Sequence, residues 1–101
     1  MEQPSAIAMK SSDNVATAIV ELREGEMSEV RIGKESKRIL IHETIPFGFK
    51  FSLREIKKGE AILKYGEPIG LASVDILPGR VVHVHNVEGA RGRGDLARKG
   101  E

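Results

Sequence analysis

The sequence predicts a mostly β fold, built of short strands and tight corners with one or two single-turn helices. The first reason is a repeated corner: an acid, an aliphatic residue, two further residues and a glycine occur at 21–25, 55–59 and 75–79. The second is that the apolar segments between corners are short and rich in β-branched residues, which favour strands. The third is the strict alternation of 81–87, which is typical of a strand with one buried face.

Length and composition restrict the kind of protein. The chain has 101 residues, enough for one domain with a modest core. Its 16 basic and 15 acidic residues nearly cancel, so the net charge gives no reason to expect nucleic acid or an anionic membrane as a partner. The sequence has no cysteine, which excludes disulfides and thiolate chemistry. No apolar run approaches the roughly 20 residues of a membrane span and no signal peptide is visible, so we expect a cytoplasmic protein.

The expected elements follow one another as short segments. Residues 1–12 are small and polar and should form a flexible N-terminus, with at most a short strand at 6–9. Residues 13–90 form the expected folded domain, and 91–101 form a Gly/Arg-rich tail. Within the domain, strands are expected at 15–19, 30–32, 38–45, 49–53, 61–63, 69–72 and 81–87, with a charged hairpin tip at 34–38.

Each repeated corner has a simple physical interpretation. The acid caps a short turn, the aliphatic residue enters the core, and the glycine takes the positive φ that reverses the chain. A small residue precedes each glycine by seven positions: Ala18, Ser52 and Ala72. The corners are 34 and then 20 residues apart, which is too uneven for a solenoid. The pattern therefore predicts one compact set of strands joined by similar corners.

His83 and His85 are the first candidate functional residues. In a strand, side chains two positions apart share a face, so both imidazoles would point the same way, about 6–7 Å apart at the backbone, while Val82 and Val84 enter the core. Such a pair can share a metal ion or flank an anionic ligand. It can equally be two half-exposed strand residues that bond to neighbouring loops, because a metal site needs a third ligand and a pocket. His42 is expected to be an ordinary surface residue.

Several motifs together resemble a known family. They are Lys64-Tyr65-Gly66-Glu67-Pro68-Ile69-Gly70 and Val82-His83-Val84-His85-Asn86, with Arg93-Gly94-Asp95-Leu96 behind them and Asp13-Asn14-Val15-Ala16 near the start. Over residues 13–96 the chain resembles the SAF domain of altronate and galactarate dehydratases, the UxaA family. The small subunit of sulfolactate sulfo-lyase is similar. The resemblance implies a SAF-type β-clip, which agrees with the corners and short strands.

The resemblance also implies a function, the small subunit of a two-component sugar-acid hydro-lyase. Such an enzyme removes water from an aldonate or aldarate to give a 2-keto-3-deoxy acid, and a separate large subunit supplies most catalytic groups. A divalent metal, Fe²⁺ or Mn²⁺, shared with the large subunit is implied as well, and it suits imidazole and carboxylate ligands. His83 and His85 would be the catalytic and metal-binding residues of this chain. The chain is not expected to be active alone, and a homo-oligomer is compatible with its sequence.

Five further residues are candidates for binding the sugar acid: Lys64, Glu67, Asn86, Arg91 and Arg93. Lys64 would face a substrate carboxylate, although Lys64 and Glu67 also suit a corner salt bridge worth less than about 1 kcal/mol. Asn86 would hold His85 or a ligand hydroxyl, or else close an ordinary turn. The guanidinium groups of Arg91 and Arg93 suit carboxylates, but the two residues can also belong to an unstructured tail.

One position departs from the family pattern. After the Ile-Pro turn the family usually has Gly-His-Lys, whereas here Gly48 is followed by Phe49 and Lys50. An apolar ring in this place supports an alternative function, a non-catalytic module that binds a sugar acid or assembles with a partner. A sulfolactate sulfo-lyase subunit is a third interpretation, which differs only in the leaving group. Lys50 is expected at the surface.

Three phenylalanines are a candidate docking surface. Phe47, Phe49 and Phe51 would share one face if their segment is extended. That face would either contact a large subunit or belong to the core of this domain.

Overall fold

The computed structural model of the chain describes residues 3–89. Within this range the chain forms strands joined by turns, and no membrane-spanning helix is present there. The strands are β1 (Ala6–Ala8), β2 (Val15–Ala18), β3 (Met27–Ile32), β4 (Glu35–Leu40), β5 (Lys50–Ser52), β6 (Ala61–Lys64), β7 (Glu67–Ala72), β8 (Val81–Val82) and β9 (Val87–Glu88). The mostly β prediction is confirmed. The expected single-turn helices are absent from the described residues, where the corners are turns instead.

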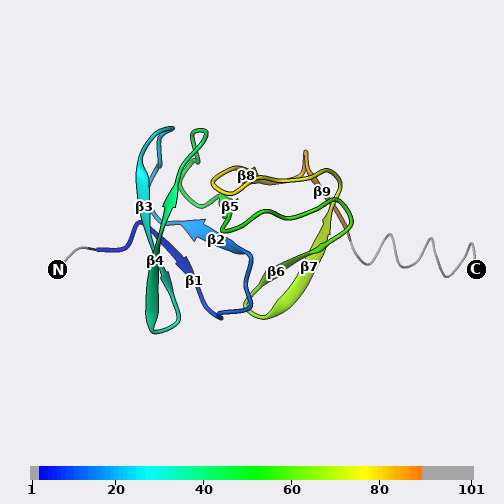
Figure 1. Ribbon diagram of the computed structural model, residues 1–101, viewed down its shortest axis with the longest axis horizontal. Helices are drawn as coiled ribbons and strands as arrows, with labels where there is room; N and C mark the ends of the chain where they lie inside the picture. Colours follow the sequence, from blue (N-terminus) through cyan, green and yellow to red (C-terminus); the bar gives the residue numbers. More distant parts are fainter. Residues whose placement is uncertain (1–2, 90–101) are drawn as a thin grey trace, which may run out of the picture.

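The strands form two sheets (Figure 1). The larger sheet has the order β4-β3-β1-β2-β5-β8, and the smaller has the order β6-β7-β9. Strands β1 and β3 are parallel, and the other pairings are antiparallel. The β3–β4 and β6–β7 hairpins lie at opposite ends of the view, with β5 and β8 between them.

The N-terminal segment is part of the larger sheet. Strand β1 lies between β2 and β3, and its residues Ala6 and Ala8 are buried. The short strand that the sequence allowed at 6–9 is therefore present, and it belongs to the larger sheet. Small side chains gave no sign of burial in the sequence, yet they fit at the crowded centre of the sheet, where larger ones would collide with the core.

Four corners of the described chain share one geometry. In each, an aliphatic residue is followed three positions later by a glycine with positive φ. The four pairs are Leu22 with Gly25, Ile45 with Gly48, Ile56 with Gly59, and Ile76 with Gly79. The sequence pattern found three of them and missed the one at 44–48, because Thr44 stands in the place of the acid. The signal common to all four is thus the aliphatic residue and the glycine.

The corners bind one another in two pairs. In each pair the aliphatic residues exchange two backbone hydrogen bonds of 2.7–2.9 Å: Leu22 with Ile45, and Ile56 with Ile76. The residue seven positions before each glycine completes the pairing. Ala18, for example, accepts the N–H of Gly48 at 2.8 Å and donates its own to the carbonyl of Phe49 at 2.9 Å. The small residues noted in the sequence therefore lie where two corners meet.

Acids cap two of these corners from an unexpected position. The carboxylate of Glu26 accepts the N–H of Arg23 at 2.9 Å, and Glu60 does the same for Lys57. Both capping acids follow the glycine, from where they reach back over the turn. The expected caps form exposed ion pairs with the same basic residues instead: Glu21 with Arg23 and Glu55 with Lys57.

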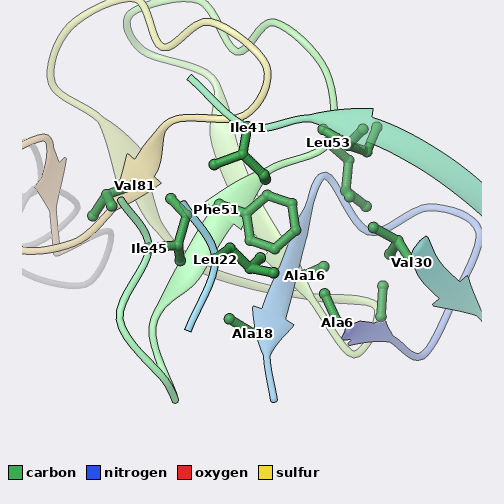
Figure 2. Packing of buried hydrophobic residues seen from close by; sticks show 12 residues of the cluster. Ala6, Ala16, Ala18, Leu22, Val30, Ile41, Ile45, Phe51, Leu53 and Val81 are labelled. Atoms are coloured by element: carbon green, nitrogen blue, oxygen red, sulfur yellow. The ribbon is translucent and has the colours of Figure 1, made fainter. Parts of the chain in front are cut away.

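Two apolar clusters lie beneath the paired corners. In the larger one, the fully buried ring of Phe51 is surrounded by aliphatic side chains, among them Leu22 and Ile45 of the first corner pair (Figure 2). The second cluster contains Ile56 and Ile76 of the other pair. Each corner pair therefore places its two aliphatic residues in its own cluster.

Asp13 joins the N-terminal segment to the β6–β7 hairpin. Its carboxylate accepts the backbone N–H groups of Gly66 at 2.7 Å and of Met9, Lys10 and Tyr65 at 3.1 Å each. Burial opposes the charged form, but the four hydrogen bonds outweigh burial and hold the pKa of Asp13 below its ordinary value of 3.8. The carboxylate is therefore charged at neutral pH and holds two loops together.

Asp13→Asn is expected to lower the free energy of unfolding by about 2–3 kcal/mol at neutral pH, because an amide cannot accept all four N–H groups as a carboxylate does. Urea unfolding measures the change. Since the folded pKa is lowered, this contribution is fully present above the unfolded pKa and is lost as the pH falls through the folded one. The difference in unfolding free energy between Asp13→Asn and the unaltered protein should thus become smaller below about pH 4.

A matched control is Asp75→Asn. The exposed carboxylate of Asp75 accepts a single backbone N–H, from Lys58 at 2.8 Å, so its loss should cost less than about 1 kcal/mol. Equal stability of Asp13→Asn and the unaltered protein at neutral pH would contradict the role given to Asp13.

Candidate functional site

An open pocket of about 330 Å³ lies where the two sheets approach each other. It is lined by Lys50, Ile69, Val82, His83, Val84, Val87 and Gly89. Most of the wall is aliphatic, and the polar side chains in it are the ammonium of Lys50 and the imidazole of His83. Apolar walls with a few convergent polar groups are typical of small-ligand sites, and these two groups suit an anion.

The segment 81–87 is not one strand. Strand β8 ends at Val82, a turn covers 83–86, and β9 begins at Val87. The buried side chain of Asn86 closes this turn, since its oxygen accepts the N–H of His83 at 2.9 Å and its amide donates to the carbonyl of Val81 at 2.8 Å. Asn86 thus closes an ordinary turn, and its role in binding a substrate stays a prediction. Val84, predicted to enter the core, is 79% exposed.

The turn gives the two histidines different surroundings. His83 lines the pocket, and its ring lies against Phe49 with 4.5 Å between centroids and 34° between planes. Both histidines are exposed, but His85 is not part of the pocket wall. The predicted placement of both rings on one face of a strand is wrong, because the turn interrupts the two-residue repeat. Their catalytic and metal-binding roles stay predictions.

Phe49 connects the pocket to the core. It is half-buried and packs against the larger apolar cluster while its ring supports His83. Phe51 is fully buried, whereas Phe47 is 71% exposed in the turn before Gly48. The three rings lie at three depths, so the predicted docking face made of all three is wrong. The Gly48 turn is the reason, because the extended segment begins only after it.

Lys50 is a site residue that the sequence interpretation missed. It is half-buried in β5, opposite Val82 of β8, and it lines the pocket instead of the outer surface. Burial, and then the charge of nearby Lys64, lower the pKa of Lys50. The available signal was its place after Gly48-Phe49, where the family pattern also has a lysine.

Lys64 ends β6 and is not one of the residues that line the pocket. Its Nζ is 4.9 Å from the centroid of the Tyr65 ring. Glu67 faces Lys64 in the hairpin register, yet the expected salt bridge between them is absent from the described part of the chain. Glu67 is exposed, and no contact places it in the pocket.

Tyr65 has an unusual backbone. Among residues 3–89 it is the only non-glycine with positive φ, at 57°. Together with Gly66 at 77° it forms the two-residue loop between β6 and β7, in which two positive φ values match a type I′ turn. Asn is strongly preferred to Tyr at the first position of that turn. The ring is 55% exposed, so core packing does not explain its presence.

These features lie within a segment that matches a known family. The profile described as the altronate/galactarate dehydratase SAF domain matches residues 4–90. The chain belongs to this family. The SAF domain thus includes strand β1, the four corners and all the residues that line the pocket.

Curated relatives support the same conclusion. Altronate dehydratase of Escherichia coli (strain K12) is 40% identical over 80 residues, which cover 79% of this chain and 15% of the relative. Altronate dehydratase of Bacillus subtilis (strain 168) is 38% identical over 84 residues, which cover 83% of this chain and 16% of the relative. A (2R)-sulfolactate sulfo-lyase subunit alpha, from Chromohalobacter salexigens, is 37% identical over 51 residues, which cover 50% of this chain and 54% of the relative. The SAF domain therefore spans only 15–16% of the altronate dehydratases that it resembles.

The remaining candidate residues either lie away from the pocket or fall outside residues 3–89, which the structure describes. His42 is exposed beside Gly79, to whose carbonyl it donates its backbone N–H at 3.0 Å. Arg91 and Arg93, with the rest of the predicted tail, lie outside the described residues.

The described part of the SAF domain does not by itself fit a divalent metal. Residues 3–89 contain no group of three or more histidine, cysteine, aspartate or glutamate side chains that could hold one. His83 has the ammonium of Lys50 in the same pocket, and that positive charge opposes a metal ion. The predicted Fe²⁺ or Mn²⁺ stays a prediction that needs donors from elsewhere.

Tyr65→Asn is expected to raise the free energy of unfolding by about 0.5–1 kcal/mol, because it relieves an unfavourable backbone conformation. Urea unfolding is the measurement, and Tyr65→Phe, which keeps both the backbone and the ring, should leave stability unchanged. A less stable Tyr65→Asn would contradict this account of the loop.

Phe49→Leu is expected to release the ring of His83 without unfolding the domain, since leucine keeps most of the apolar volume. The ring-proton NMR shifts of His83 should move toward those of a histidine that has no aromatic neighbour, because the ring of Phe49 that shields them is lost. The shifts of His42 and His85 should stay constant, and Phe47→Leu should move none of the three. Unchanged His83 shifts would contradict the stacked arrangement.

Proposed function

We propose that this SAF domain is the small subunit of a two-component sugar-acid hydro-lyase of the altronate dehydratase type. The main support is the pocket in which Lys50 and His83 meet, because its charge and size suit the carboxylate end of a sugar acid. The pocket is open, and the chain spans a small part of the altronate dehydratases. A large chain would close the site and provide the missing groups, and the subunit alpha among the relatives supports a separate chain.

The chemistry assigns a task to each of the two residues. Dehydration breaks the C–H bond next to the carboxylate, and the electron pair moves toward that carboxylate as an enediolate. The ammonium of Lys50, bound to the carboxylate, stabilises this developing charge. The C–O bond on the neighbouring carbon then breaks, and a proton from His83 lets the hydroxyl leave as water. The resulting enol becomes a 2-keto-3-deoxy acid, and the base that takes the first proton would come from the large chain.

The support that Phe49 gives His83 fits this task. A ring that lies against a half-buried neighbour has fewer orientations open to it, and a positioned acid is more effective than a mobile one. His85 has no such support in the described residues. We therefore assign the proton transfer to His83 and place His85 at the surface that the large chain would cover.

The test is reconstitution with a large chain of the UxaA family, with formation of 2-keto acid from aldonates and aldarates as the readout. Lys50→Met and His83→Asn are each expected to lower kcat/KM by about 10²-fold or more, since each removes a group that acts in the transition state. The matched controls Lys34→Met and His42→Asn, both at exposed positions outside the pocket, should leave kcat/KM unchanged. Full turnover by Lys50→Met or His83→Asn would overturn the assignment.

One observation favours a second candidate, a non-catalytic module that binds a sugar acid. Phe49 stands where the family pattern has a histidine, and this apolar ring lies against His83 with 4.5 Å between the ring centroids. In that case the chain should bind the acid but give no turnover with any large chain. A sulfo-lyase subunit would use the same two residues with sulfite as the leaving group, so reconstitution should include sulfolactate.

A further inference from the structure

We propose that the large chain docks on the outer face of the larger sheet, and that the surface it brings there is acidic. The outer face is the side of this sheet that points away from the larger apolar cluster. The inference rests on the proposed function, which requires a large chain, and it adds where the two chains touch.

One row of residues crosses the outer face from one edge of the sheet to the other. Residues paired in neighbouring strands point to the same side of a sheet, and the strand registers connect one residue of each strand. From β4 to β8 they are Ser36, Arg31, Ile7, Thr17, Lys50 and Val82. Their chain neighbours Ala6, Ala8 and Val30 belong to the larger apolar cluster. The row therefore lies on the opposite side of the sheet from that cluster.

This row leads from open surface into the pocket. At one end Lys50 and Val82 line the pocket, whereas at the other end Arg31 and Ser36 are exposed. Six strands about 4.8 Å apart make the row about 24 Å long. That length is close to the width of a standard interface, which buries about 800 Å² on each partner. A chain that closes the pocket can therefore continue across the sheet without a break.

The β3–β4 hairpin extends the outer face beyond the row. In its register Met27 faces Leu40 and Glu29 faces Arg38, all on the side to which Arg31 points. Met27 and Leu40 are 57% and 43% exposed, so they form a cross-strand apolar pair in solvent. The Nε of Arg38 lies 3.5 Å from the carboxylate of Glu29, while Arg31 forms no ion pair within residues 3–89.

Charge decides which occupant suits this face. Its basic side chains Arg31, Arg38 and Lys50 outnumber its one acid, Glu29. A second copy placed face to face would bring like charges together, and residues 90–101 are themselves richer in basic than in acidic side chains. A different chain with an acidic surface is complementary to it. In the altronate dehydratases most of each protein lies outside the matched segment, so an occupant large enough for both the face and the pocket is expected.

The test measures binding of this domain to a UxaA-family large chain that has no SAF domain of its own. Titration calorimetry gives the dissociation constant, and urea unfolding checks that each variant is folded. Arg31→Glu and Leu40→Glu are each expected to raise the dissociation constant by about tenfold or more, because each places a negative charge against the acidic partner. Raising the ionic strength should also weaken binding of the unaltered domain.

The matched controls are Lys58→Glu and Leu77→Glu. Both residues are exposed, and both belong to the corners that pair through Ile56 and Ile76, outside the larger sheet. Their variants should bind the large chain as the unaltered domain does. At saturating concentrations of the domain, Arg31→Glu and Leu40→Glu should keep the kcat of the unaltered pair, since neither residue lines the pocket.

The outcomes separate the docking face from the proposed function. Unweakened binding by Arg31→Glu and Leu40→Glu, or an equal loss in the controls, would overturn the docking face. The proposed function would stand in that case if Lys50→Met still lowered kcat/KM. Binding that is insensitive to salt would overturn the acidic partner surface. Self-association of the domain that Leu40→Glu abolishes would assign the face to a second copy and overturn the inference. If the unaltered domain and the large chain do not bind, both proposals fail.

Discussion

The mutual hydrogen bonding of paired corners is the constraint on which the rest of this structure depends. A sharp reversal exposes backbone N–H and carbonyl groups that the short strands beside it cannot satisfy. Here each corner receives those bonds from another corner, as between Leu22 and Ile45. The same contact places both aliphatic side chains in the core. A domain of very short strands is stable under these conditions because its turns are paired as well as its strands.

The corners also determine where the pocket forms. Gly48 and Gly79 belong to different corner pairs, and the chain that leaves each of them becomes β5 or β8 within a few residues. These two strands pair, so Lys50 of one lies beside Val82 of the other. The pocket wall is therefore built from segments whose starting points are fixed by backbone bonds, which is the kind of support that a binding site requires.

The described chain departs from ordinary local preferences at the β6–β7 loop and at two lysines. Tyr65 occupies a position that favours Asn, and neither Lys50 nor Lys64 forms an ion pair within residues 3–89. Elsewhere the structure is locally consistent, with buried polar groups such as Asn86 fully bonded. Departures of this kind collect at functional sites, because a ligand later compensates for them.

The sequence alone determined the β class, three of the four corners and the family, because each depends on residues close together in the chain. It did not determine the turn at 83–86, since alternation looks the same whether or not the Asn86 side chain replaces strand hydrogen bonds. The sequence also did not determine how deeply each phenylalanine is buried, or that Lys50 lines the pocket. Burial depends on which distant strand lies alongside, here β8 beside β5, and only the tertiary structure brings those strands together.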